Sequence, residues 1–157
     1  MEDILTYGIV FGLLIIFTYV FLSKKDKTKR FSLSQKIYSY GNIDVRLEKQ
    51  GKEITFLVIK YSLKDVSPDY FKLTSEMVLI DNSILLVEIP QENILIENKS
   101  VLKIPFDVFR NLLKEKTKQL NYFKIVITFA SNKKLKSGIL AFNKRWNIYA
   151  PDSGKYN

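Results

Sequence analysis

The hydrophobic positions of this chain follow two different patterns. Residues 4–22 form one uncharged, mostly apolar run of nineteen residues, whereas short apolar stretches separated by polar turns fill the chain from residue 43 onward. At a rise of about 1.5 Å per residue, the first run would make a helix of roughly 28 Å, close to the thickness of the bilayer core. The first pattern therefore predicts a transmembrane helix over residues 4–22, and the second predicts a β-rich domain.

The clearest strand pair lies at the start of that domain. Ile43, Val45 and Leu47 alternate with charged residues, a period of two that indicates a strand with one wet face. A turn at residues 49–52 leads into residues 54–63, which are apolar on both faces over 54–59. We expect the second strand to be central in its sheet and covered on both sides.

Further strands follow the same logic of short apolar stretches around turns. Residues 77–80 and 84–89 predict a second hairpin, residues 94–97 and 101–104 a third, and residues 123–130 a central strand. Residues 64–75 predict a connection, and residues 139–150 a closing strand or pair bent around Asn143. The fold class is therefore α+β, mainly β, with about 7–8 antiparallel strands.

One amphipathic helix interrupts the strands. Pro105 suits a first helical turn, and apolar residues recur after it at helical spacing until about Asn121 (Phe106, Phe109, Leu112, Leu113, Leu120). The apolar stripe favours packing on the sheet, and the alternative is a helix that lies on a membrane surface with Arg110 and its lysines toward lipid.

The domain boundaries follow from these elements. We expect a short extracytoplasmic terminus at 1–3, the transmembrane helix at 4–22, a basic juxtamembrane segment and linker at 23–42, a β-rich domain at 43–150 and a polar tail at 151–157. Residues 31–42 show no clear period and end in Gly41-Asn42, which is typical of a linker and turn.

The charges that flank the apolar run predict its orientation. No basic residue precedes it, and five follow it closely, namely Lys24, Lys25, Lys27, Lys29 and Arg30. The positive-inside rule then places the amino terminus outside and the domain in the cytoplasm, as in a single-pass inner-membrane protein. A cleaved signal peptide fits less well, because the leading residues are acidic and no small-residue cleavage site follows.

Two glycines within the run suggest a helix partner. Gly8 and Gly12 have the G-x-x-x-G spacing, which puts both on one helix face and lets a second helix approach closely. This spacing has low specificity, because glycine is common in membrane helices. It predicts association with a copy of the chain or with another protein.

Composition excludes several chemistries and leaves two uses for the charge. The chain has no cysteine and no histidine, which removes disulfides, Cys/His zinc sites, thiol nucleophiles and Ser-His-Asp triads. Residues 105–157 carry eleven Lys or Arg against three Asp or Glu. This excess is either a solvated basic face or a surface for anionic lipid, whose candidate residues are Lys24, Lys25, Lys27, Lys29, Arg30, Lys133, Lys134, Lys136, Lys144 and Arg145.

The last predicted strand also mixes aromatic and basic residues, which is a composition of nucleic-acid surfaces. We favour a core strand instead, since a membrane-tethered domain meets lipid or protein more often, and a nucleic-acid partner is disfavoured. No catalytic, metal or cofactor-binding residue stands out, so we do not expect an enzyme. We expect an anchored accessory or assembly protein whose domain binds a protein partner at the inner membrane face. The alternative is an anionic-lipid sensor.

Overall fold

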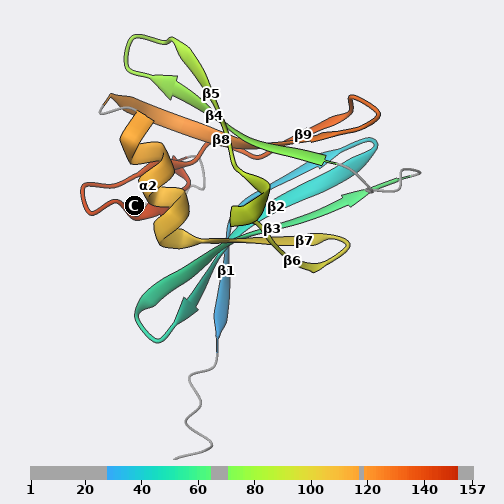
Figure 1. Ribbon diagram of the computed structural model, residues 1–157, viewed down its shortest axis with the longest axis horizontal. Coiled ribbons are helices and arrows are strands. Elements are labelled where there is room, and N and C mark those ends of the chain that lie inside the picture. The colour runs from blue at the N-terminus through green and yellow to red at the C-terminus, as the bar shows by residue number, and fades with distance from the viewer. Residues whose placement is uncertain (1–27, 65–70, 117–118, 152–157) are drawn as a thin grey trace, which may run out of the picture.

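The alternating segments of the sequence pair into two antiparallel sheets, which the computed structural model describes for residues 28–64, 71–116 and 119–151 (Figure 1). The five-stranded sheet, called sheet A, has the order β1 (Lys29–Tyr38), β2 (Gly41–Gln50), β3 (Glu53–Leu63), β7 (Val101–Pro105), β6 (Leu95–Asn98). The four-stranded sheet, called sheet B, has the order β5 (Ile84–Glu88), β4 (Phe71–Leu79), β8 (Leu120–Phe129), β9 (Lys134–Lys136). Two short strands, β10 (Ala141–Phe142) and β11 (Ile148–Tyr149), pair with each other beside β8.

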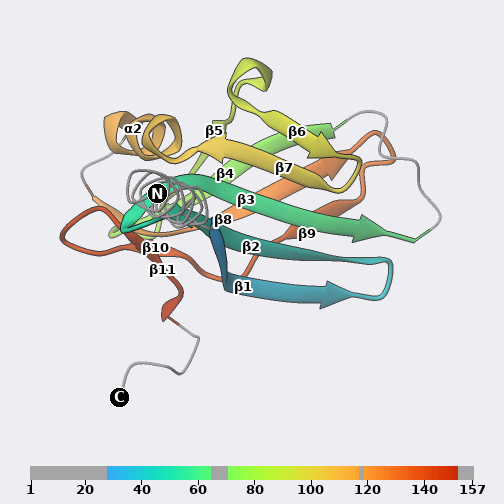
Figure 2. The same cartoon turned by 90° about the horizontal axis from the view of Figure 1, so that it is seen from below.

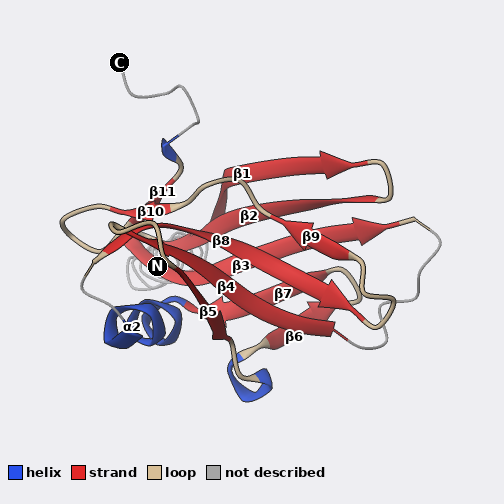
Figure 3. Cartoon of the chain, turned by 90° about the horizontal axis from the view of Figure 1, so that it is seen from above, coloured by secondary structure: helices blue, strands red, loops and turns tan. Residues whose placement is uncertain are grey.

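The core lies between the two sheets because their inward-facing positions are apolar. Figure 3 shows sheet B lying over sheet A, with the helix at one end. Sheet A contributes fully buried Val45 and Leu57, and sheet B contributes Met77 and Ile125. Burying such side chains is worth about 1.5–3 kcal/mol each relative to exposure, which makes this layer the main source of stability.

Helix α2 (Phe106–Lys116) closes one end of the core. Its apolar stripe, formed by Phe106, Phe109 and Leu113, is buried, and the Phe109 ring lies 5.7 Å from the ring of Phe123 on β8. The prediction that this helix packs on the sheet is confirmed. A short 3-10 helix, η1 (Gln91–Asn93), lies in the connection from β5 to β6.

One side of the sandwich is closed by bonds between the two sheets. The Tyr38 hydroxyl, at the end of β1, donates to the Lys136 carbonyl at 2.8 Å and accepts from the Lys136 amide at 3.2 Å. The Tyr40 hydroxyl donates to the Lys134 carbonyl at 2.6 Å, and the Gly138 amide donates to Ser34 Oγ at 2.8 Å. We call this the β1/β9 side.

The opposite side carries the other two sheet edges, β6 and β5. The chain crosses between them at residues 89–94, where Ile89 and Ile94 are buried. We call this the β5/β6 side.

The mainly β architecture and the three hairpins are confirmed, while several boundaries were wrong. Residues 29–38, expected to be linker, form β1, so the domain begins earlier than residue 43. A bulge between Ser32 and Ser34 breaks the alternation, and most of β1 is exposed, so its sequence shows no period. Strand β4 begins at Phe71 within the expected connection, α2 ends at Lys116 rather than near residue 121, and the described residues contain eleven strands instead of about seven or eight.

The predicted transmembrane helix at residues 4–22 lies outside the described residues, as do Gly8, Gly12, Lys24, Lys25 and Lys27. Within the ranges that the structure describes, no helix is long and apolar enough to cross a membrane. The structure gives no support to the predicted span, which stays a prediction.

Candidate functional site

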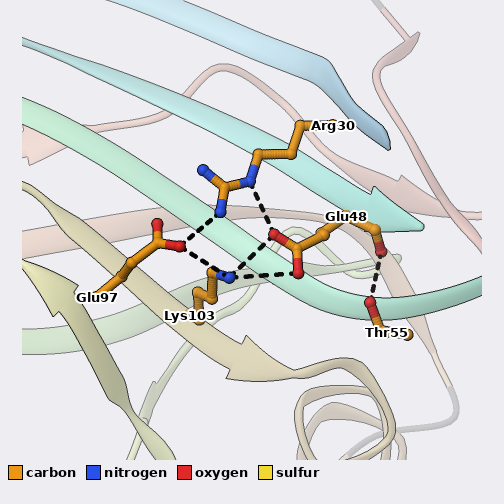
Figure 4. Close-up of polar contacts among 5 residues, drawn as sticks. All are labelled: Arg30, Glu48, Thr55, Glu97 and Lys103. Carbon is orange, nitrogen blue, oxygen red and sulfur yellow. Dashed lines mark hydrogen bonds and ion pairs between the residues drawn. The ribbon is translucent and has the colours of Figure 1, made fainter. Parts of the chain in front are cut away.

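A network of four charged side chains crosses the outer face of sheet A (Figure 4). Glu48 of β2 lies opposite Arg30 of β1 in the strand register and accepts a bond from its Nε at 2.7 Å. Lys103 of β7 reaches Glu48 at 3.0 Å, with its Nζ 5.4 Å from the centre of the Phe56 ring. Glu97 of β6 forms ion pairs with both cations, with Arg30 at 2.7 Å and with Lys103 at 3.0 Å. The network therefore ties β1 to β6 across the sheet.

The electrostatics of this network keep its carboxyls charged. Burial of Glu48, whose side chain is 6% exposed, opposes ionisation, but the hydrogen bonds from Arg30 and Lys103 outweigh burial and lower the pKa of Glu48. Hydrogen bonds from Arg30 and Lys103 also lower the pKa of Glu97. The same bonds, first from Glu97 and then from Glu48, raise the pKa of Arg30.

These pKa directions bear on what the network can do. Both carboxyls are held by cations and are ionised at neutral pH, so neither is poised to donate or accept a proton there. Among the residues that the structure describes, no group of three acidic side chains could hold a metal ion. We interpret the network as a structural tie.

The structure separates the predicted lipid-facing residues into two ends of the domain. Lys29 begins β1, whereas Lys134 and Lys136 of β9 lie beside Tyr40 and Tyr38 at its other end. Over the ten residues of β1 the two ends are roughly 30 Å apart. Lys133 lies over the Tyr40 ring, 5.7 Å from its centre, and belongs to the same far end.

The other predicted basic residues differ in their partners and positions. Lys136 Nζ is paired with Glu76 at 2.7 Å, and Arg30 is held within the charged network. Lys144 and Arg145 are exposed in the β10–β11 turn, whose Asn147 lies near the end where β1 begins. One flat membrane cannot contact all of the predicted residues that the structure describes in one orientation, because these occupy both ends.

A polar cavity lies at the end where β1 begins. It has a volume of about 380 Å³ and is lined by Lys49, Lys52, Glu53, Ile54, Phe106, Asp107, Arg110 and Asn147. Arg110 is paired with Asp107 at 2.9 Å, whereas Lys49 Nζ lies 5.4 Å from the centre of the Phe31 ring. Phe31 is 48% exposed. We call Phe31, Lys49, Lys52 and Arg110 the entry surface.

The β5/β6 side carries the second candidate surface. Ile84 and Leu86 on edge strand β5 are 64% and 65% exposed, and Leu95 and Ile96 on edge strand β6 are 50% and 62% exposed. Single exposed apolar residues are normal, but these four lie on the two strands whose outer edges have no pairing strand among the described residues, which makes the two edges a candidate site for a partner strand.

Sequence reasoning missed both surfaces. Lys49 and Lys52 were interpreted as turn residues, and the strand pattern of residues 84–86 gives no sign of which strands form sheet edges. The only available signal was that residues 84–87 and 94–96 are apolar at every position. An edge strand with one solvent-facing side would instead alternate apolar and polar residues.

The comparisons with other proteins add no relative. No known family model matches the chain, and neither a curated protein nor a solved structure shows significant similarity to it. The surfaces described above are therefore the only guide to its function.

Proposed function

We propose that this chain is a membrane-anchored assembly protein whose β-rich domain binds a protein partner through the β5/β6 side. The observation that carries the proposal is the exposure of Ile84, Leu86, Leu95 and Ile96 on two edge strands. An edge strand has unpaired backbone N–H and C=O groups, which an extended segment of a partner can join by strand addition. The exposed apolar side chains would then select a partner segment with apolar residues.

The anchor in this proposal comes from the sequence alone. The uncharged run at residues 4–22 and the basic residues after it suit a single pass with the domain in the cytoplasm. Gly8 and Gly12 offer a second contact, between helices, with the same partner or with a copy of this chain.

The test is purification of the tagged full-length chain in mild detergent, followed by mass spectrometry of the proteins that accompany it. Leu86→Lys and Ile96→Lys place a charge on each edge, and Ile37→Lys is the matched control, because Ile37 is 76% exposed but lies on β1. We expect a stoichiometric partner to be lost in one or both edge variants and retained in the control.

The helix contact is tested separately with Gly8 and Gly12 both changed to Ile. Loss of the partner in this variant would add the helix face to the interface. A partner that stays in both edge variants, or the absence of any partner, would contradict binding at the β5/β6 side.

A further inference from the structure

We infer that the entry surface lies against the anionic leaflet, so that Phe31, Lys49, Lys52 and Arg110 contact lipid headgroups while the far-end lysines do not. The inference rests on the proposed anchor. It differs from the expectation drawn from sequence, in which the lysines of residues 133–136 were lipid contacts.

The position of the tether supports this orientation. Six residues separate Leu22, at the end of the apolar run, from Lys29, where β1 begins, so a fully extended connection of seven residue steps reaches at most about 25 Å. Lys29 lies opposite Lys49 in the strand register, next to the β2–β3 turn that carries Lys52. β1 enters at the bottom of Figure 1, and Figure 2 views the domain from that side. A bilayer that holds the tether is therefore closest to the entry surface.

The three basic side chains of the entry surface outnumber the two carboxylates that line its cavity, Glu53 and Asp107, and Asp107 is already paired with Arg110. Among the described residues, neither Lys49 nor Lys52 pairs with a carboxylate, unlike Lys103 and Lys136 elsewhere on the domain. Unpaired lysines beside a basic juxtamembrane segment are attracted to anionic headgroups. The cavity between them, about 380 Å³, is large enough to admit a headgroup phosphate.

Phe31 adds an apolar contact to the basic ones. Its ring is half exposed, and the Lys49 ammonium lies 5.4 Å from the ring centre. An aromatic ring beside a lysine can enter the boundary between headgroups and acyl chains while the ammonium stays with the phosphates. At the far end, Lys36 and Lys133 lie over the rings of Tyr38 and Tyr40, but both tyrosine hydroxyls bond to β9, so each ring is held against the opposite sheet.

The experiment uses the absence of cysteine, which allows one fluorophore per full-length chain. Gln50→Cys labels the end of β2, next to the β2–β3 turn at the entry surface, and Ser131→Cys labels the β8–β9 turn at the far end. Both positions are exposed and uncharged, so they form a matched pair. Each labelled protein is reconstituted in vesicles of phosphatidylcholine, with or without phosphatidylglycerol, that contain a headgroup nitroxide quencher.

We expect the label at residue 50 to be quenched about threefold more than the label at residue 131 in anionic vesicles, with the difference reduced at 1 M salt, where the Debye length is about 3 Å. Combined Lys49→Glu and Lys52→Glu should abolish the difference, and combined Lys133→Glu and Lys134→Glu should leave it unchanged. The same pattern in vesicles without phosphatidylglycerol would overturn the role of anionic lipid.

Equal quenching at the two labels, or stronger quenching at residue 131, would overturn the orientation. Flotation of the vesicles in alkaline carbonate checks the anchor separately. Protein that leaves the vesicles refutes the anchor and this inference together. Retained protein with equal quenching refutes this inference alone and leaves the partner-binding proposal standing.

Discussion

The β1/β9 side and the β5/β6 side bring together edges of the same two sheets but finish them differently. On the β1/β9 side, the hydroxyls of Tyr38 and Tyr40 bond to the main chain of β9, and that of Ser34 bonds to the main chain just after β9. On the β5/β6 side, Ile84, Leu86, Leu95 and Ile96 are exposed along the two edges. One side therefore uses its polar side chains to close the sandwich, and the other presents apolar side chains to its surroundings.

This difference separates stability from binding. Proteins usually protect sheet edges, because an unprotected edge pairs with other chains. The β1/β9 side follows that rule through specific bonds, whose loss should weaken the fold. Substitutions of exposed side chains on the β5/β6 side should leave the fold intact and change only what binds there.

The largest expected effect on stability is at Gly41, which follows the β1–β2 turn on the β1/β9 side. Gly41→Ala would place a Cβ against the carbonyl oxygen of Ser62 and 3.3 Å from the Cα of Leu63, so the strands must shift. We expect a loss of about 2–3 kcal/mol in the free energy of unfolding. Urea denaturation of the full chain in mild detergent, followed by the fluorescence of Trp146, the one tryptophan, measures it. Ser39→Ala, at an exposed position in the same turn, is the control.

The next effect tests the charged network that ties β1 to β6. Glu48→Gln removes the buried carboxylate shared by Arg30 and Lys103 and should cost about 1–2 kcal/mol at pH 7, less than a fully buried pair because Arg30 is 37% exposed. The pKa of Glu48 is lower in the folded chain than in the unfolded one, so its contribution is complete above the unfolded pKa of about 4.3.

As the pH falls through the lower folded pKa, that contribution is lost. The stability difference between the original chain and the Glu48→Gln variant should therefore be constant near neutral pH and shrink under acid. Urea titrations at a series of pH values measure it. A difference that does not depend on pH would mean that Glu48 stabilises the fold by packing rather than by charge.

A smaller effect tests a single bond of the β1/β9 side. Tyr38→Phe keeps the ring and leaves the Lys136 amide and carbonyl without their hydroxyl partner, which should cost about 1 kcal/mol. Tyr122→Phe on the outer face of sheet B is the matched control and should change stability by less than about 0.5 kcal/mol. Equal losses in the two variants would mean that the hydroxyl bonds do not hold this side together.

The smallest expected effect on stability is on the β5/β6 side. Ile96→Lys changes a side chain that is 62% exposed, so the free energy of unfolding should change by less than about 0.5 kcal/mol. The same denaturation experiment measures it. A loss above 1 kcal/mol would show that β6 is needed for the fold itself, and it would remove the distinction between the two sides.

Local pattern was enough to predict the hairpins but not the ends of several elements. The alternation of Ile43, Val45 and Leu47 predicts β2, because one face of that strand packs in the core. Strand β1 escaped prediction because its bulge and its exposure remove the periodic signal. Tertiary contacts hold β1 in place, because Tyr38 and Ser34 bond to residues about a hundred positions later in the chain.

The candidate sites were predicted less well for the same physical reason. The alternation assigned Asp44 and Glu48 to a wet face, but both are buried on the outer face of sheet A beneath Arg46, Arg30 and Lys103. Whether a carboxylate is covered by cations in this way depends on which strands become neighbours. The residues that form the entry surface depend on strand neighbours in the same way. Counting charges along the sequence shows that basic residues are concentrated in the last third. It does not show that the predicted lipid-facing residues lie at the two ends of β1.

The bonds that close the β1/β9 side also bear on how this protein can change over generations. Tyr38 and Tyr40 bond to main-chain atoms of residues 136 and 134, which every amino acid except proline supplies at those positions. Mutation can therefore alter the side chain at residue 134 without loss of the bond, whereas replacement of either tyrosine removes it. We expect descendants of this sequence to retain hydroxyl-bearing aromatics at 38 and 40 and to vary freely at 134. Selection on this contact then falls on one sheet only.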